Sequence, residues 1–117
     1  MTINEAIARV REMKADSVTD ETLIYWLSVI DGKVAKEIHR TDFNPYKADT
    51  DRQTELLVPF PYTDIYIRYL EAMIDEKNQE IDSFTNDMVL FNNEYENYAA
   101  EYCRTHHSPD YKIKFTL

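Results

Sequence analysis

The side chains best suited to chemistry are a cysteine and two histidines near the end of the chain. Cys103, His106 and His107 offer sulfur and nitrogen ligands within five residues. A structural zinc ion usually needs four such ligands, and the remaining histidine, His39, is far away in sequence. A nucleophile and its base would also need a third group that orients them, and none is evident. We therefore interpret this segment as a solvated helix end, where the helix dipole favours cations, and we predict no metal site.

Four carboxylates, Asp75, Glu76, Glu80 and Asp82, are a second candidate for chemistry. Paired carboxylates can perform acid–base catalysis when a sheltered cleft shifts their pKa values. Exposed acidic helix faces are far more common, so we expect these four to form the polar face of a helix. Gly32 is the only glycine, which argues against phosphate-binding loops and nucleophile elbows, because each needs several glycines. The sequence therefore predicts no cofactor, and we do not expect an enzyme.

The composition is typical of one small domain that spans residues 1–117 and lies in the cytoplasm. The 117 residues are 44% hydrophobic, and a single cysteine excludes an internal disulfide. No apolar run approaches the roughly 20 residues that cross a bilayer, and the amphipathic start is not a typical signal peptide. Thirteen Lys and Arg residues against 22 Asp and Glu give a net charge of −9. Such acidity is unfavourable for binding to nucleic acid or to anionic membranes.

The spacing of apolar residues predicts an all-α protein, a small bundle of three to four helices with a long loop. The first helix covers about 3–14, where Thr2 and Glu5 can form a capping box. The second covers about 20–40 and begins after Thr19, another capping residue. Its core face is made of Leu23, Trp26, Leu27, Ile30, Val34 and Ile38.

Residues 41–61 are predicted to form an irregular loop. Pro45 favours an extended conformation at Asn44, and a connection of this length is unusual in so small a domain. The segment is either a functional loop or partly disordered. Its last part is apolar, and we expect this part to cover the end of the core; it consists of Leu56, Leu57, Val58 and Phe60.

From Tyr62 to about Arg104 the chain contains neither Pro nor Gly, and apolar residues recur at helical spacing. One continuous helix of this length would span roughly 65 Å, which is too long for a lone small domain. The polar residues 82–87 are therefore predicted to break or kink it. The alternative is one helix that projects beyond the core.

Tyrosines of this region are candidate interface residues. Tyr62 and Tyr66 are four residues apart and share a helix face, as do Tyr98 and Tyr102. Tyr is enriched at protein interfaces, where its ring is buried and its hydroxyl finds a partner. A small core would also take up many tyrosines, and the sequence leaves both possibilities open.

Residues 108–117 are predicted to be an extended tail with a possible C-terminal β-strand. Tyr111, Ile113, Phe115 and Leu117 alternate with polar residues, which is the period of a strand. A single strand must pair with another, so these four residues are candidates for docking onto a neighbouring subunit by strand addition. A frayed terminus is the alternative.

Three sequence features together suggest a family. They are the VPFPY helix start at 58–62, the IDEKNQEI segment at 74–81 and the FNNEYENYAAEYCRTH segment at 91–106. With them, residues 20–107 resemble small helical proteins encoded in the head-morphogenesis region of prophages of Gram-positive bacteria. These proteins are similar to the head–tail connector, or adaptor, proteins of long-tailed phages.

The resemblance implies a structural role in the virion. Connector subunits form a ring at the portal vertex, so the expected partners are further copies of the chain, the portal protein and a tail or head-completion protein. Assembly would take place in the host cytoplasm, and the ring would stay at the virion head–tail junction. An acidic channel wall would let DNA slide, because it repels phosphates. The alternative is a small acidic protein-binding or inhibitor module of phage origin that mimics nucleic acid.

Overall fold

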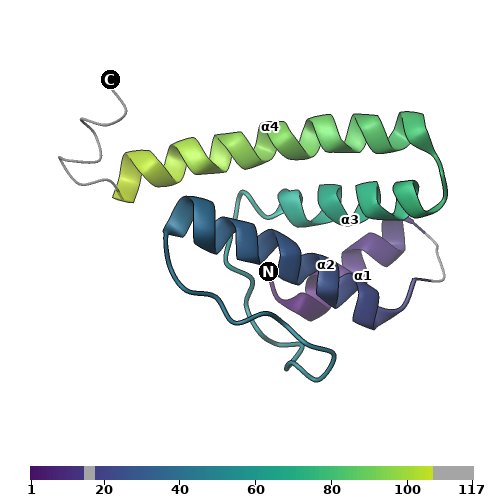
Figure 1. Cartoon of the computed structure of the whole chain (residues 1–117), viewed down its shortest axis with the longest axis horizontal. Coiled ribbons are helices and arrows are strands. Elements are labelled where there is room, and N and C mark those ends of the chain that lie inside the picture. Colours follow the sequence, from purple (N-terminus) through teal and green to yellow (C-terminus); the bar gives the residue numbers. More distant parts are fainter. Residues whose placement is uncertain (15–17, 107–117) are drawn as a thin grey trace.

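The computed structural model describes residues 1–14 and 18–106, and this part of the chain is an α-helical bundle (Figure 1). The prediction of a small all-α bundle is therefore confirmed. Its elements in chain order are α1 (Ile3–Met13), α2 (Asp20–Lys33), the π-helical segment η1 (Val34–His39), α3 (Asp64–Lys77) and α4 (Ile81–His106). The tail and its predicted strand lie outside the described residues.

The helix α3 lies at the centre of the bundle and contacts α1, α2 and α4. Figure 1 shows α3 and α4 side by side as a hairpin, with α1 and α2 on the other side of α3. Among the described helices, α4 packs only against α3 and η1. With 26 residues, α4 is about 39 Å long, against about 21 Å for the 14 residues of α3. Among the described helices, the side of α4 that faces away from α3 and η1 therefore has no neighbour.

Both predicted caps are present. The Thr2 hydroxyl accepts a hydrogen bond from the Glu5 amide, and the Glu5 carboxylate accepts one from the Thr2 amide, each at 3.1 Å. The Thr19 hydroxyl accepts from the Thr22 amide at 3.2 Å at the start of α2. These bonds satisfy amide groups that a helix start leaves without partners.

The long helical region is broken at Asn78–Glu80, and not at residues 82–87 as predicted. Gln79 has a φ of 60°, in the left-handed region, and the Glu80 amide donates to the Asp75 carbonyl at 2.9 Å. This pattern ends a helix. Residues 82–87 belong instead to the first turns of α4, where the helix dipole favours the acidic side chain of Asp82. The polar stretch therefore marks a helix start.

The predicted loop contains no helix and lies against the start of α1. The amides of Ile3 and Asn4 donate to the carbonyls of Thr54 and Arg52 at 3.0 and 2.9 Å, and the Leu56 amide donates to the Met1 carbonyl at 2.9 Å. Leu56 and Val58 are buried, as expected for residues that close the core. Phe60 is exposed, so the expectation that it also covers the core is wrong.

A fully buried carboxylate, that of Asp31 in α2, holds the loop to the core. Its Oδ2 atom accepts hydrogen bonds from the Tyr46 hydroxyl at 2.6 Å and the Leu57 amide at 3.0 Å. Its Oδ1 atom accepts from the Tyr66 hydroxyl of α3 at 2.6 Å, which in turn accepts from the Val58 amide at 2.7 Å. Burial raises the pKa of Asp31, and the hydrogen bonds from Tyr46, Tyr66 and Leu57 oppose that rise. Two helices and the loop therefore meet at one side chain.

We predict that Tyr66→Phe destabilises the protein by about 1–3 kcal/mol. The change leaves the Asp31 carboxylate short of a donor and the Val58 amide without an acceptor, both in the interior. Urea unfolding followed by circular dichroism measures the loss. Tyr25→Phe is the control, because Tyr25 is exposed on α2, and it should change stability by less than about 0.5 kcal/mol. An equally small effect for Tyr66→Phe would contradict the role given to its hydroxyl.

Candidate functional site

The four tyrosines predicted as interface residues in this region occupy different environments, and Tyr62 lies before α3 and not in a helix. Tyr66 is 0% exposed, and its hydroxyl donates a hydrogen bond to Asp31. It is therefore a core residue, and not the interface residue that the sequence suggested. Tyr98 is also buried, while Tyr62 and Tyr102 are half-buried. The other four candidates, Tyr111, Ile113, Phe115 and Leu117, lie outside the described residues.

Tyr98 and Tyr102 fasten the end of α4 to η1 through His39. The His39 Nε2 atom lies 2.7 Å from the Tyr98 hydroxyl, and the His39 ring stacks on Tyr102 with centroids 4.5 Å apart. The His106 ring also stacks on Tyr102, with centroids 4.0 Å apart, and the ring centroids of Tyr62 and Tyr98 are 5.4 Å apart. His39, distant in sequence from the end of α4, is thus close to it in space. Its ring is engaged in packing with tyrosines.

The acidic residues 75–82 do not form one polar face, because Asp75 is 0% exposed and forms an ion pair with Lys14. Glu76, Glu80 and Asp82 are exposed as expected. The structure adds two carboxylates that the sequence analysis missed, Glu71 and Asp87, which are buried near Asp75. Spacing would have found Asp87, because it lies three residues after Phe84 and four before Phe91 on the apolar stripe of α4.

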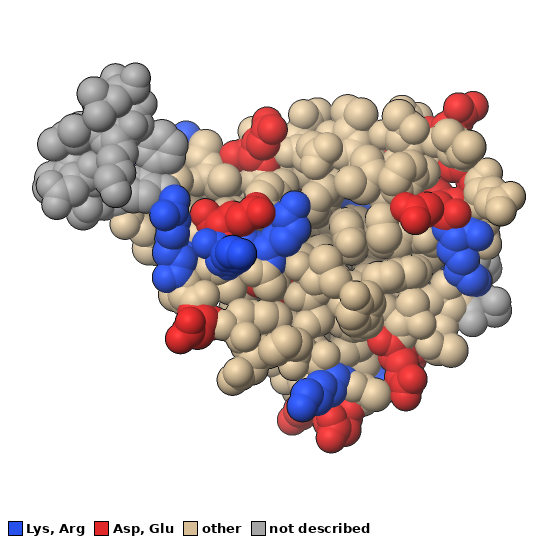
Figure 2. All heavy atoms as spheres, viewed as in Figure 1, with Lys and Arg blue, Asp and Glu red and all other residues tan. Residues whose placement is uncertain are grey.

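The uncovered side of α4 differs from the rest of the surface in its lack of charge. Between Asp82 and Glu96 the structure describes every residue, and no exposed residue there is charged. We define the outer α4 face as the exposed residues of this stretch: Thr85, Asn86, Val89, Leu90, Asn92 and Asn93. Figure 2 shows uncharged atoms over most of the ridge that α4 forms. In a chain with 30% charged residues, depletion of charge on an exposed helix is typical of an interface.

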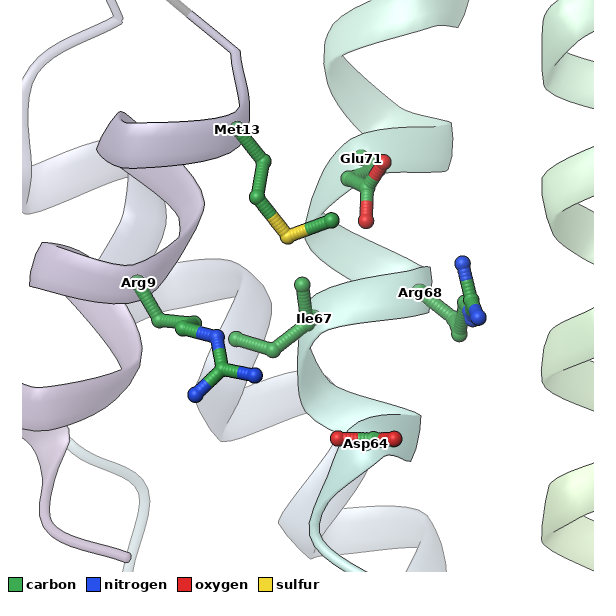
Figure 3. Close-up of a pocket in the computed structure, with 6 residues that line it drawn as sticks. All are labelled: Arg9, Met13, Asp64, Ile67, Arg68 and Glu71. Atoms are coloured by element: carbon green, nitrogen blue, oxygen red, sulfur yellow. The ribbon is translucent and has the colours of Figure 1, made fainter.

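A small cavity lies between α1 and α3 (Figure 3) and has a volume of about 130 Å³. Arg9 and Met13 reach from α1 toward Ile67, while Arg68 lies on the other side of α3 and pairs with Glu94 at 3.7 Å. Pockets that bind small molecules usually enclose about 300–1,000 Å³. This cavity is therefore too small for a substrate-sized ligand.

No protein-family model, curated protein or solved structure matches this chain. In residues 1–14 and 18–106, no three Cys, His, Asp or Glu side chains are arranged to hold a metal ion. Within the same residues, every helix is either too short or too polar to cross a membrane. Of the features found here, the outer α4 face is the one whose chemistry points to a partner.

We predict that acid weakens the His39 contact at the end of α4. Burial first, and the charge of His106 second, hold the pKa of His39 below its usual 6.5, with Asp31 acting in the opposite sense. Because the folded state disfavours the charged imidazole, its contribution to stability is present above pH 6.5 and is lost as the pH falls below it. Between pH 7.5 and 5.5 the wild type should therefore lose stability relative to His39→Gln in urea unfolding. Parallel stability curves for the two proteins would contradict this role of His39.

Proposed function

We propose that this protein is a structural, non-catalytic subunit of a phage head–tail connector, which binds further copies of itself and the portal protein in a ring at the portal vertex. The sequence of residues 20–107 supports the proposal through its resemblance to such proteins. The observation that carries it furthest is the outer α4 face. It offers a neighbouring protein a helical surface, from Thr85 to Asn93, whose exposed side chains carry no charge.

Electrostatics explains why this face suits assembly. Each copy has a net charge of −9, so most ways of bringing two copies together place like charges close to each other. A contact through the outer α4 face avoids that cost, because its exposed side chains are amides, a hydroxyl and aliphatic groups. Val89 and Leu90 supply apolar area, and the asparagines can form hydrogen bonds across an interface. The face therefore fits a protein partner better than it fits nucleic acid.

The turn between α3 and α4 supports a second part of the proposal. Glu76, Glu80 and Asp82 are exposed around this turn, at one end of the molecule (Figure 1). If the turns of successive subunits line a channel, their carboxylates repel the phosphates of DNA and let the duplex slide. Such a surface would act on DNA without binding it sequence-specifically.

Native mass spectrometry of the protein, alone and mixed with the portal protein of the proposed prophage, tests the proposal. A closed ring, or saturable binding of many copies to one portal ring, is the expected result. A monomer or dimer that ignores the portal would overturn it. A stable monomer that instead binds a DNA-binding enzyme with nanomolar affinity would establish the alternative, an acidic module that mimics nucleic acid.

We predict that Val89→Glu weakens binding to the portal or to other copies at least about tenfold, which corresponds to about 1.4 kcal/mol. The new carboxylate lies in the middle of the outer α4 face and must be desolvated on contact. Met13→Glu is the matched control, because Met13 and Val89 are exposed to the same extent (52% and 53%) and both lie on helices. It adds the same charge on α1 and should leave binding unchanged. Equal losses for both variants would show that net charge, and not this face, determines binding.

A further inference from the structure

Three buried carboxylates lie between α1, α3 and the first half of α4. Glu71 and Asp75 belong to α3 and Asp87 to α4, and their exposed fractions are 7%, 0% and 8%. Lys14, just after α1, forms an ion pair with Asp75. Burying charged groups is costly unless they are paired, and here one ammonium faces three carboxyl groups. This imbalance calls for a further positive charge or for a proton on one of the acids.

The hydrogen bonds of these three carboxyl groups indicate that one of them carries a proton. Each of the three has a buried oxygen without a donor: Oε1 of Glu71, Oδ2 of Asp75 and Oδ2 of Asp87. Asp75 interacts with Asp87 as well as with Lys14 and Ser83. A carboxylate only accepts hydrogen bonds, so two carboxyl groups can bond to each other only when one of them carries a proton. A proton held between Asp75 and Asp87 satisfies both.

We propose that Asp75 and Asp87 share one proton, and that this proton holds the first half of α4 on α3. The proposal concerns the fold itself and does not depend on portal binding. It makes the attachment of α4 weaken as the pH rises from acid toward neutrality, because losing the proton leaves two like charges facing each other in the interior.

The surrounding charges agree with this assignment. Burial, the hydrogen bond with Asp75 and the negative charges of Glu71 and Asp75 raise the pKa of Asp87 to about 6, with Lys14 opposing them. Burial alone would raise the pKa of Asp75, but its hydrogen bonds with Asp87, Lys14 and Ser83 bring it below its usual value. The two aspartates thus have pKa values shifted in opposite directions, although their side chains are identical.

The other charged groups near the pair lie on α3, on α4 and in the turn between them. Burial raises the pKa of Glu71, which Arg68 and Lys14 oppose. Arg68 itself is directed to Glu94 of α4 at 3.7 Å, and Glu80 of the turn acts on Lys14. None of these supplies the pair with a second cation among the described residues. Lys14 remains the cation that Asp75 and Asp87 share.

The sign of the effect follows from the raised pKa of Asp87. Its folded value lies above the ordinary 3.8, so its contribution to stability is complete below about pH 4 and is lost as the pH rises through about 6. The two values allow a change of up to roughly 100-fold in the unfolding equilibrium constant over this range. The His39 contact at the other end of α4 has the opposite dependence, because its stabilisation is lost in acid. The stabilities of variants must therefore be compared, so that the effect of the shared proton is separated from that of His39.

Asp87→Asn is the decisive variant, because an amide can donate to Asp75 at any pH without a titrating proton. We expect it to match the wild type at about pH 4 or below and to be roughly 10- to 100-fold more stable, in unfolding equilibrium constant, at pH 7.5. Asp82→Asn removes an exposed carboxylate from the same helix and should follow the wild-type pH profile. If Asp87→Asn is less stable than the wild type at pH 7.5, the shared proton is excluded.

Two measurements on the wild-type protein complete the test. Carboxyl carbon NMR should show one aspartate that titrates near pH 6, and amide hydrogen exchange, corrected for its intrinsic pH dependence, should show residues 81–94 less protected at pH 7.5 than at pH 5. Asp87→Asn should abolish the loss of protection. If every aspartate titrates below pH 5, the proposal fails whatever the variants do.

Discussion

The arrangement of the bundle depends on the buried carboxylate of Asp31. A charged group without partners in the interior would be costly, and this one is made acceptable by two tyrosine hydroxyls and a backbone amide. Those donors come from the loop and from α3, so the cost is met only when both lie in their native positions. The same contacts place Val58 and Leu56 against the core. Asp31 thus converts a loop rich in polar residues into a fixed part of the fold.

Local features of the chain were predictable from sequence because they depend on neighbouring residues. Apolar spacing identified the helices, and Thr2 and Thr19 identified two of their starts. The end of α3 was misplaced because polar residues mark both helix breaks and helix starts, and only the left-handed backbone of Gln79 distinguishes them. Asp31 interrupts the otherwise apolar stripe of α2, and this interruption indicates that hydrogen-bond donors are buried beside it.

The environments of the tyrosines depend on tertiary contacts that spacing cannot reveal. Tyr66 and Tyr98 are both buried, yet the hydroxyl of Tyr66 bonds to a carboxylate of α2 and that of Tyr98 to the imidazole of His39. Their partners are 35 and 59 residues away in sequence. Helical periodicity predicts which side of a helix a tyrosine occupies, but not whether that side meets a neighbouring helix, a loop or solvent. Tyrosine hydroxyls allow either outcome, because they can be buried wherever a partner lies within reach.

Charge on α4 is distributed in the reverse of the usual way. Its inner side holds Asp87 against two further buried carboxylates, whereas its exposed side carries no charge between Asp82 and Glu96. For a helix that faces water this arrangement is unfavourable, since an aspartate is better solvated outside and aliphatic side chains are better buried. It becomes favourable if a partner covers the outer α4 face, because Val89 and Leu90 are then removed from water without desolvating a charge. Under the proposed function α4 lies between two protein surfaces, and this position accounts for the inverted pattern.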